Sequence, residues 1–391
     1  MQLFTAAALC AVGAEKIVSN ELKKLGLAVL ESGFGRVRFS SDLVGLYRSL
    51  MSLRAADRLL LEAGRFPAGD FDALFEGTRN IPWESLVPRN MGLKVGKVRC
   101  SRSKLKAETT VQAMVHKAAA GRLCAHYGMR RLPEPEGNKL PAPALLYRAG
   151  GSPVCPQAEL RVYVEKDNAS VLLDLSGEPL FKRGYRREGG PAPLRESTAA
   201  ALLLLSGWKR KFPLYDPLCG SGTIIIEACL YAWDQAPGLG RRFVLSDLAA
   251  GDRRVEDEVR GELAARIDYG RVVRIFGSDA DPRAVALAKA NVRRAAELAG
   301  RFKRAPGVRG PGQELSKTPV LESLPLAEAR PPTEDTGCII TNPPYGRRLG
   351  DSESAAAGYA GMAVLRENFP GWKLALICDH PGFESCFGKK A

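Results

Sequence analysis

The feature that most constrains the fold is a repeated succession of strand and helix after residue 187. An apolar strand predicted at Phe212–Asp216 runs into a glycine turn and then into a helix at Thr223–Trp233. Further strands, separated by helices, are predicted at Val272–Ser278, Cys338–Thr341 and Lys373–Cys378. Strands that alternate with helices form a mostly parallel sheet with helices on both faces. The C-terminal half is therefore predicted to be a doubly wound α/β domain.

The first 190 residues follow a different pattern. A helix at Glu15–Leu25 and a strand at Gly35–Phe39 indicate a small α+β unit, and a middle region combines further strands with a helix at Val111–Tyr127. With 391 residues, the chain is too long for one ordinary domain. We predict the following division: residues 1–60, residues 61–177, a basic linker at 178–190, and the α/β domain at 191–391.

Charge and composition narrow the function classes. The formal net charge of +14 favours a polyanionic partner, because basic side chains neutralise phosphates and release counterions. No stretch approaches the ~20 apolar residues that span a bilayer, and Glu15 and Lys16 directly follow the apolar N-terminus. We therefore expect no membrane segment, no secretory signal and a cytoplasmic location. Nine cysteines without a CxxC pair predict neither a metal site nor a disulfide framework.

The first motif is DPLCGSGT, at residues 216–223. Its glycines let the backbone turn tightly beside a ligand, and its acid suits an ammonium such as that of S-adenosylmethionine. No lysine follows the last glycine, which argues against a nucleoside triphosphate. The alternative is a glycine turn that only joins strand to helix. The residues assigned to the methyl donor here are Asp216, Cys219, Gly220, Gly222 and Thr223.

The second motif is GSDADP, at residues 277–282. Asp279, at the end of a strand, is placed to accept two hydrogen bonds from a ribose diol. Asp281 joins the predicted donor-binding set, although its position before Pro282 is more simply that of a helix N-cap. The polar stretch at 247–266, between the first two motifs, is interpreted as an insertion.

The third motif is Asn342-Pro343-Pro344-Tyr345, and these four residues are the predicted catalytic set. The Asn342 amide oxygen and the Pro343 carbonyl can accept hydrogen bonds from one NH2 group, while Tyr345 offers a face for base stacking. Positioning does most of this chemistry, because a sulfonium methyl needs little activation. A target base in a duplex must first be flipped out. The alternative is a proline turn that ends a strand.

The three motifs, in this order, resemble those of the amino-methylating class I methyltransferases. The whole chain resembles the THUMP-domain class I RNA methyltransferases, once labelled N6-adenine-specific DNA methylases. It is most similar to the branch that matches the N-terminal half of the enzyme making N2-methylguanosine in 23S rRNA. The supporting stretches are LRAADRLLL at 53–61, LDLSGEPLFKRGYRREGGPAPLRES at 173–197 and PGLGRRF at 237–243.

The resemblance implies a ferredoxin-like unit at 1–60, a THUMP RNA-binding domain at 61–177 and a Rossmann-like methyltransferase domain at 191–391. It implies S-adenosylmethionine as cofactor and 23S rRNA, or a large-subunit precursor, as partner; it leaves the oligomeric state open. It also places Arg195 and Glu196 where the family closes over the methionine end of the donor. Relatives add two strands after the point where this chain ends, so we expect a catalytic sheet of about five strands.

Some expectations are less constrained. A basic segment with interleaved aromatic residues suits phosphates and bases, so we assign Lys182, Arg183, Tyr185 and Arg186 to RNA binding, with a solvated linker as the alternative. Arg347 stands where relatives usually carry glutamate, and no acid for the donor adenine is identified. Alternative functions are N6-adenine methylation of RNA or DNA, and a catalytically weak RNA-binding or ribosome-assembly factor.

Overall fold

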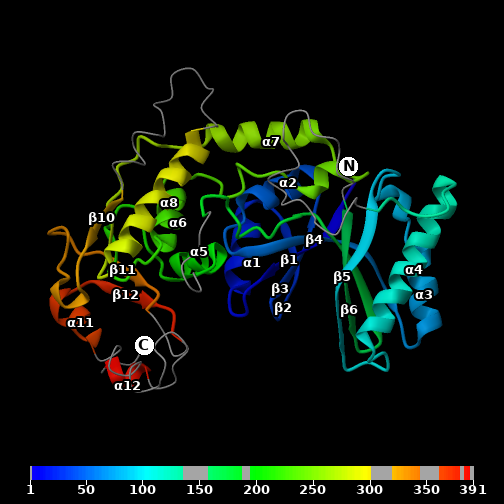
Figure 1. The fold of residues 1–391 in the computed structure, drawn as a ribbon, viewed down its shortest axis with the longest axis horizontal. Coiled ribbons are helices and arrows are strands. Elements are labelled where there is room, and N and C mark those ends of the chain that lie inside the picture. The colour runs from blue at the N-terminus through cyan, green and yellow to red at the C-terminus, as the bar shows by residue number, and fades with distance from the viewer. Residues whose placement is uncertain are drawn as a thin grey trace. The chain divides into compact units, whose positions relative to one another are not determined.

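The computed structural model describes residues 2–134, 157–186, 194–300, 319–343, 361–378 and 383–387 (Figure 1). The chain divides into two compact units, which we call unit 1 and unit 2. Unit 1 consists of Met1–Met51, Ala56–Leu180 and Arg242–Arg260, and unit 2 of Ser52–Ala55, Phe181–Arg241 and Gly261–Ala391. Among the described residues, no helix is both long and apolar enough to cross a membrane.

Unit 1 is built on one seven-stranded sheet of order β2-β3-β1-β4-β7-β6-β5. Its long strand β4 pairs antiparallel with β1 on one side and with β7 on the other, so the sheet continues through residue 60. Strands β5 and β6 form a parallel pair. The strand bounds are β1 Phe4–Cys10, β2 Ala28–Gly33, β3 Arg36–Ser41, β4 Ala56–Pro67, β5 Gly92–Ser101, β6 Gln157–Glu165 and β7 Asn168–Asp174.

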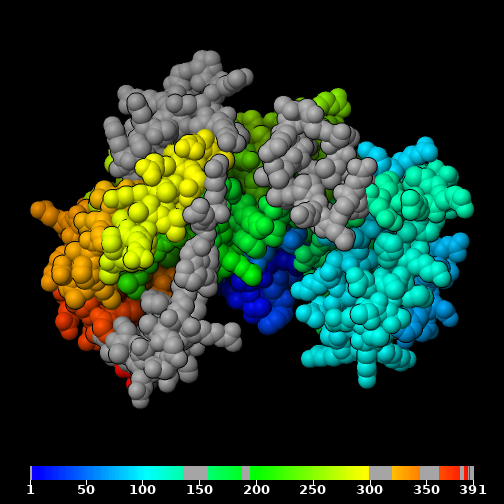
Figure 2. Space-filling model, viewed as in Figure 1, coloured from blue at the N-terminus to red at the C-terminus, as the bar shows by residue number. Residues whose placement is uncertain are grey.

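Several helices of unit 1 pack against this sheet. Helices α3 and α4 pack against each other and against β4 and β5, and α4 lies at the molecular surface (Figure 2). Along β6 every second residue is buried, because alternate side chains of a strand point to opposite faces. The helix bounds are α1 Glu15–Lys24, α2 Leu43–Ser52, α3 Phe71–Asn80, the 3-10 helix η1 Trp83–Ser85, and α4 Glu108–Tyr127.

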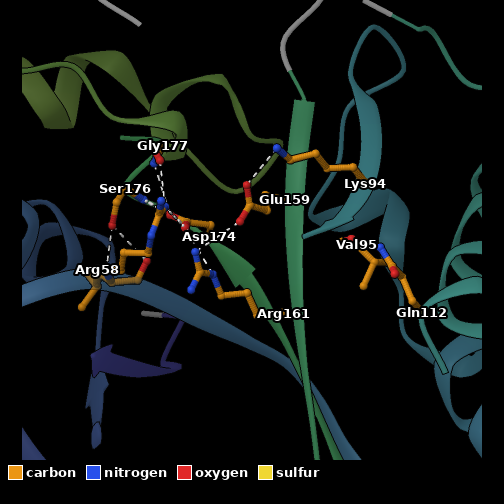
Figure 3. Close-up of polar contacts among 10 residues, drawn as sticks. Arg58, Lys94, Val95, Gln112, Glu159, Arg161, Asp174, Ser176 and Gly177 are labelled. Carbon is orange, nitrogen blue, oxygen red and sulfur yellow. Dashed lines mark hydrogen bonds and ion pairs between the residues drawn. The ribbon is translucent and has the colours of Figure 1, made fainter. Parts of the chain in front are cut away.

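The less buried face of this sheet carries charges that neutralise one another (Figure 3). Arg58 on β4 donates to the Asp174 carboxylate on β7 and, at 2.8 Å, to the Gly177 carbonyl. Burial raises the pKa of Asp174, and Arg58 opposes that shift. On β6, Glu159 lies 3.0 Å from the Lys94 ammonium of β5. These pairs connect strands across the sheet without leaving the buried carboxylate uncompensated.

The stretch interpreted as an insertion packs largely in unit 1. It contains the helix α7 (Arg253–Ala265), which continues into unit 2, and it begins at the last residue of the 3-10 helix η3 (Val244–Asp247). The Asp252 amide donates to the Tyr47 hydroxyl at 3.1 Å, and the Ala249 amide donates to the Leu86 carbonyl at 3.0 Å. The segment thus contributes to the structure of unit 1 and is more than a solvated excursion.

Unit 2 contains a five-stranded, wholly parallel sheet of order β10-β9-β8-β11-β12. The chain moves outward from β8 to β10 and then returns to the other side of β8 with β11. This reversal between β8 and β11 is the switch point where doubly wound sheets bind ligands. The bounds are β8 Leu214–Asp216, β9 Ile275–Asp279, β10 Val320–Ser323, β11 Cys338–Thr341 and β12 Lys373–Leu376.

Apolar clusters cover both faces of this sheet. Leu214 and Ile340 belong to the cluster with α5, α6 and α8, whereas their neighbours Tyr215 and Ile339 belong to the opposite cluster with α11 and α12 (Figure 1). The predicted doubly wound α/β fold is confirmed, and the described residues form the expected five strands. The helix bounds are α5 Glu196–Leu205, α6 Thr223–Ala232, α8 Pro282–Gly300, the 3-10 helix η4 Leu326–Glu328, α11 Val364–Asn368 and α12 Phe383–Phe387.

Candidate functional site

The three predicted motifs meet at the carboxyl edge of the unit 2 sheet. Strand β8 ends at Asp216, β9 at Asp279 and β11 at Thr341. These strands are neighbours, and Asp216 pairs with Gly277 in the register of β8 and β9. Parallel strands place their carboxyl ends at one edge, so residues far apart in sequence converge there.

The glycine turn between β8 and α6 is left-handed at two points, with φ of +52° at Gly220 and +79° at Gly222. A Cβ on Gly220 would point into open space, whereas a Cβ on Gly222 would lie 3.0 Å from the Ala288 Cβ. Gly222 therefore permits both the backbone conformation and the close approach of α8. Gly220 leaves room beside the turn where a ligand can lie.

Polar contacts from the neighbouring elements hold this turn. The Gly220 amide donates to Asp279 Oδ2 at 2.9 Å, and the Cys219 amide donates to the Ser278 carbonyl at 2.8 Å. On the far side, the fully buried Asn291 of α8 donates from Nδ2 to the Ser221 carbonyl at 2.9 Å. Asn291 was not predicted from the sequence, because no motif marks a single amide within a helix.

Asp216 is a buried acid at the centre of this edge. Its Oδ1 accepts the Thr341 hydroxyl at 2.7 Å and the Leu218 amide at 3.2 Å. Burial raises the pKa of Asp216 to about 7; the Thr341 hydrogen bond opposes this shift and the nearby Asp279 adds to it. The carboxyl group therefore changes charge near neutral pH, where a cationic ligand would favour its ionised form.

The two acids of the second motif have separate environments. Asp279 accepts the Gly220 amide on Oδ2 and the Asp281 amide at 3.0 Å on Oδ1, so its carboxylate orientation is fixed. It stays partly exposed, and each oxygen keeps a second lone pair. Asp281 is exposed and accepts the Arg283 amide at 2.9 Å, which is the N-cap contact expected at the start of α8.

The remaining donor-site residues, Cys219 and Thr223, are buried. Cys219 packs in the core cluster beneath the turn, and burial raises the pKa of its thiol, so it is not a nucleophile. Thr223 is the first residue of α6, and its hydroxyl accepts a hydrogen bond from Arg186 Nη2 at 2.5 Å.

Asn342 directly follows β11 and therefore lies next to the Thr341–Asp216 hydrogen bond. Its Oδ1 atom is buried and has no hydrogen-bond partner among the described residues. Pro343 is buried beside it, whereas the predicted catalytic residues Pro344 and Tyr345, and also Arg347, lie outside the described residues. Leaving a buried acceptor without a donor is costly, so a ligand that brings an N–H to this oxygen would gain a favourable hydrogen bond.

The predicted RNA-binding segment requires a correction. Lys182 is exposed, but Arg183 and Tyr185 are buried, and both approach the buried Glu227 of α6, at 3.6 Å and 3.1 Å. Arg186 is largely enclosed and contacts Thr223. Arg183 and Tyr185 thus pack inside unit 2 and are not the exposed contacts that the sequence predicted, whereas Arg186 stays partly exposed. Their pattern in the sequence was basic and aromatic, but the acid that pairs with them lies in a distant helix.

The part of the chain that the structure describes contains no set of side chains arranged to bind a metal ion. There, no group of three or more histidine, cysteine, aspartate or glutamate side chains is placed to hold an ion. The acids at the strand ends are instead occupied by backbone amides and hydroxyls.

Known proteins share this architecture. Residues 183–303 and 318–391 match the UPF0020 family, described as an RMKL-like methyltransferase domain. Residues 5–60 match the RlmL ferredoxin-like domain. The chain is 33% identical over 397 residues to the "Putative RNA methyltransferase YpsC" of Bacillus subtilis, which covers 100% of this chain and 92% of that protein.

Two solved structures are similar over the full length. "A predicted N6-adenine-specific DNA methylase" from Listeria monocytogenes has a TM-score of 0.83 at 33% identity, covering 100% of this chain and 93% of that one. "SMU.472, a putative methyltransferase complexed with SAH" has a TM-score of 0.83 at 31% identity and the same coverage. The parallel sheet with its acid–glycine turn is thus a Rossmann-like methyltransferase fold. The chain belongs to the family of RMKL-like methyltransferases.

Proposed function

We propose that this protein transfers a methyl group from S-adenosylmethionine to the exocyclic amino group of a base in RNA, namely N2 of a guanosine in 23S rRNA. The observation that carries the proposal is the buried Asn342 Oδ1 at the carboxyl end of β11, to which no described residue donates a hydrogen bond. An amide oxygen there can accept one N–H of an NH2 group and aim the nitrogen lone pair. The Pro343 carbonyl, which follows in the chain, supplies the second acceptor.

The neighbouring residues fit the methyl donor. S-adenosylmethionine, when bound, supplies a methyl group on a positively charged sulfur. Asp216, buried with a pKa raised to about 7 by its burial, binds the donor ammonium in its ionised form. Asp279 accepts the ribose hydroxyls with its remaining lone pairs, and Gly220 leaves the open space beside the turn. Methyl transfer then depends on holding nitrogen, carbon and sulfur in line.

RNA is the proposed substrate for two reasons. The formal net charge of +14 favours a polyanion, and the Bacillus subtilis relative carries the name "Putative RNA methyltransferase YpsC". We propose that residues 1–60 form the ferredoxin-like part, that residues 61–177 form a THUMP domain, and that 178–190 lead into the methyltransferase domain at 191–391. Lys182 of this linker is exposed.

The test is transfer of tritium from labelled S-adenosylmethionine to undermethylated rRNA, followed by nucleoside digestion and mass spectrometry. We expect labelled N2-methylguanosine, at least a hundredfold less with Asn342→Ala, and near-normal yield with Asn368→Ala. Asn368 is a suitable control because its amide donates to the Ala329 carbonyl at 3.0 Å, away from the motifs. If the labelled product is N6-methyladenosine, the target is an adenosine and not a guanosine. Tight RNA binding without any transfer would refute methylation and favour a binding factor.

A further inference from the structure

The described acids at the donor site do not account for one charged group of S-adenosylmethionine. Asp216 and Asp279 suit the ammonium and the ribose, but the amino-acid end of the donor also carries a carboxylate. We propose that Arg186 binds this carboxylate. The inference rests on the proposed function, since it assumes that the glycine turn receives S-adenosylmethionine. It reassigns a side chain that the sequence analysis had attributed to RNA.

The position of Arg186 supports this role. Its Nη2 donates to the Thr223 hydroxyl at 2.5 Å and to the Leu194 carbonyl at 3.0 Å. Thr223 follows Gly222 and begins α6, and Leu194 lies two residues before α5. Arg186 is therefore tied to the turn itself and to the segment that enters α5. Its guanidinium lies where the amino-acid end of a ligand on this turn would be.

The hydrogen bonds of Arg186 leave donors available. Its Nε is buried and has no hydrogen-bond partner among the described residues. Its Nη1 lies 3.6 Å from Glu196 Oε1, which is longer than an ordinary hydrogen bond. An arginine in a largely enclosed site with an unused N–H is poorly satisfied, and a ligand carboxylate would supply the missing acceptor. The side chain is 13% exposed, so the site is enclosed without being sealed.

The charges around Arg186 allow an anion to bind. Burial raises the pKa of Glu196, and Arg186 opposes that shift. Glu227, the other nearby acid, lies 3.6 Å from Arg183 and accepts the Tyr185 hydroxyl at 3.1 Å. Arg183 thus compensates Glu227, and Arg186 faces Glu196 across a loose contact. A zwitterionic ligand adds no net charge to this enclosed site, because its ammonium and carboxylate enter together.

The experiment compares two ligands by isothermal titration calorimetry. One is S-adenosylhomocysteine; the other is its decarboxylated analogue, which keeps the adenosine, the sulfur and the amino group. The intact protein should prefer S-adenosylhomocysteine by about tenfold to a hundredfold, the usual effect of one hydrogen bond between charged groups. In Arg186→Met the two ligands should bind about equally, because only the ligand with the carboxylate loses affinity.

Two further variants make the result specific. Arg186→Lys keeps the charge and should retain part of the preference. Arg210→Met removes an arginine that pairs with Asp234 elsewhere in unit 2, and should leave the preference unchanged. RNA affinity measured by filter binding should change less than twofold in Arg186→Met, and thermal unfolding should show a folded variant.

Two outcomes would overturn the inference. Equal weakening of both ligands in Arg186→Met would show that this residue only shapes the turn, and an unchanged preference would show that it plays no part. Ligand preference by calorimetry and RNA affinity by filter binding are both measured without methyl transfer. They therefore test the inference whichever base is methylated. If the intact protein bound neither ligand, the inference and the proposed donor site would fail together. If it bound S-adenosylhomocysteine normally but transferred no methyl group, only the proposed function would fail.

Discussion

At the residue scale, Asp216 makes the donor site sensitive to pH. Burial raises the pKa of Asp216 to about 7 in the free protein, so the carboxyl group is mostly neutral below that pH and ionised above it. A donor ammonium binds the ionised form, so binding must first release a proton at lower pH. We predict that affinity for S-adenosylhomocysteine rises about tenfold per pH unit up to about 7 and then levels off.

Titration calorimetry between pH 5.5 and 8.5 checks this dependence. Asp216→Asn is the matched control, because an amide keeps the size of the side chain and cannot ionise. The variant should bind weakly and with no slope below pH 7. A flat profile for the intact protein would mean that Asp216 does not meet the ammonium.

Asn291, which belongs to none of the three motifs, gives a second prediction about stability and donor binding. Its amide donates to the Ser221 carbonyl and accepts from Arg294 Nη2 at 2.6 Å, while the residue is fully buried. Asn291→Ala leaves that carbonyl without its donor, so we expect a loss of about 1–3 kcal/mol in the free energy of unfolding. We also expect weaker binding of S-adenosylhomocysteine.

Urea unfolding and calorimetry measure the two effects, with Asn368→Ala as control. Asn368 also donates to a backbone carbonyl, that of Ala329, but in a part of unit 2 without a motif. Its variant should lose stability and keep donor affinity. If both variants lost donor affinity to the same degree, the Ser221 contact would not be what holds the turn.

At the scale of elements, the turn from β8 to α6 allows a direct test of why glycine is needed. Gly222 has φ of +79° and its missing Cβ faces Ala288 at 3.0 Å. Gly222→Ala should therefore destabilise unit 2 by about 1–3 kcal/mol through backbone strain and contact with α8. Gly261→Ala in α7 meets no atom within 4 Å and has no positive φ, so it should be neutral or stabilise by about 0.5–1 kcal/mol. Thermal unfolding of both variants measures the difference. An equal change in stability for Gly222→Ala and Gly261→Ala would contradict this explanation.

The elements that the sequence predicts well are those with both a strong pattern and a motif at one end. Strand β11 begins and ends where predicted, and helix α6 begins at Thr223 as expected. Strands β1, β2 and β10 were not identified. Strand β10 has four residues and lies beside a stretch rich in proline and glycine, so its periodicity is too short to recognise.

Pairing between distant segments was beyond the sequence for a different reason. The continuity of β4 with β1 and β7 depends on hydrogen bonds of the backbone, which carry no residue signature. Arg183 and Tyr185 looked like an RNA-facing segment because the sequence shows their charge and rings and does not show Glu227 beside them. The donor-site acids were predictable because each is the last residue of its own strand, and the parallel topology brings strand ends together.

At the scale of the whole molecule, the formal net charge of +14 predicts how binding responds to salt. If single-stranded RNA contacts neutralise four phosphates, the logarithm of RNA affinity should fall with the logarithm of salt concentration with a slope of about −3. Filter binding between 50 and 400 mM KCl measures this slope. The reason is entropic: each neutralised phosphate releases counterions, and salt reduces that gain.

The donor site should respond differently, and that contrast is the control. Asp216 is buried and S-adenosylhomocysteine is zwitterionic, so its affinity should change less than twofold over the same salt range. A shallow slope for RNA would mean that the excess charge is not used for a polyanion, and it would weaken the RNA assignment independently of any assay for methyl transfer. A steep slope for both ligands would instead indicate that salt perturbs the fold, which a circular dichroism spectrum at each concentration would show. An affinity for RNA that falls steeply with salt, together with a donor affinity that does not change, is what we expect of a chain with a net charge of +14 and an enclosed donor site.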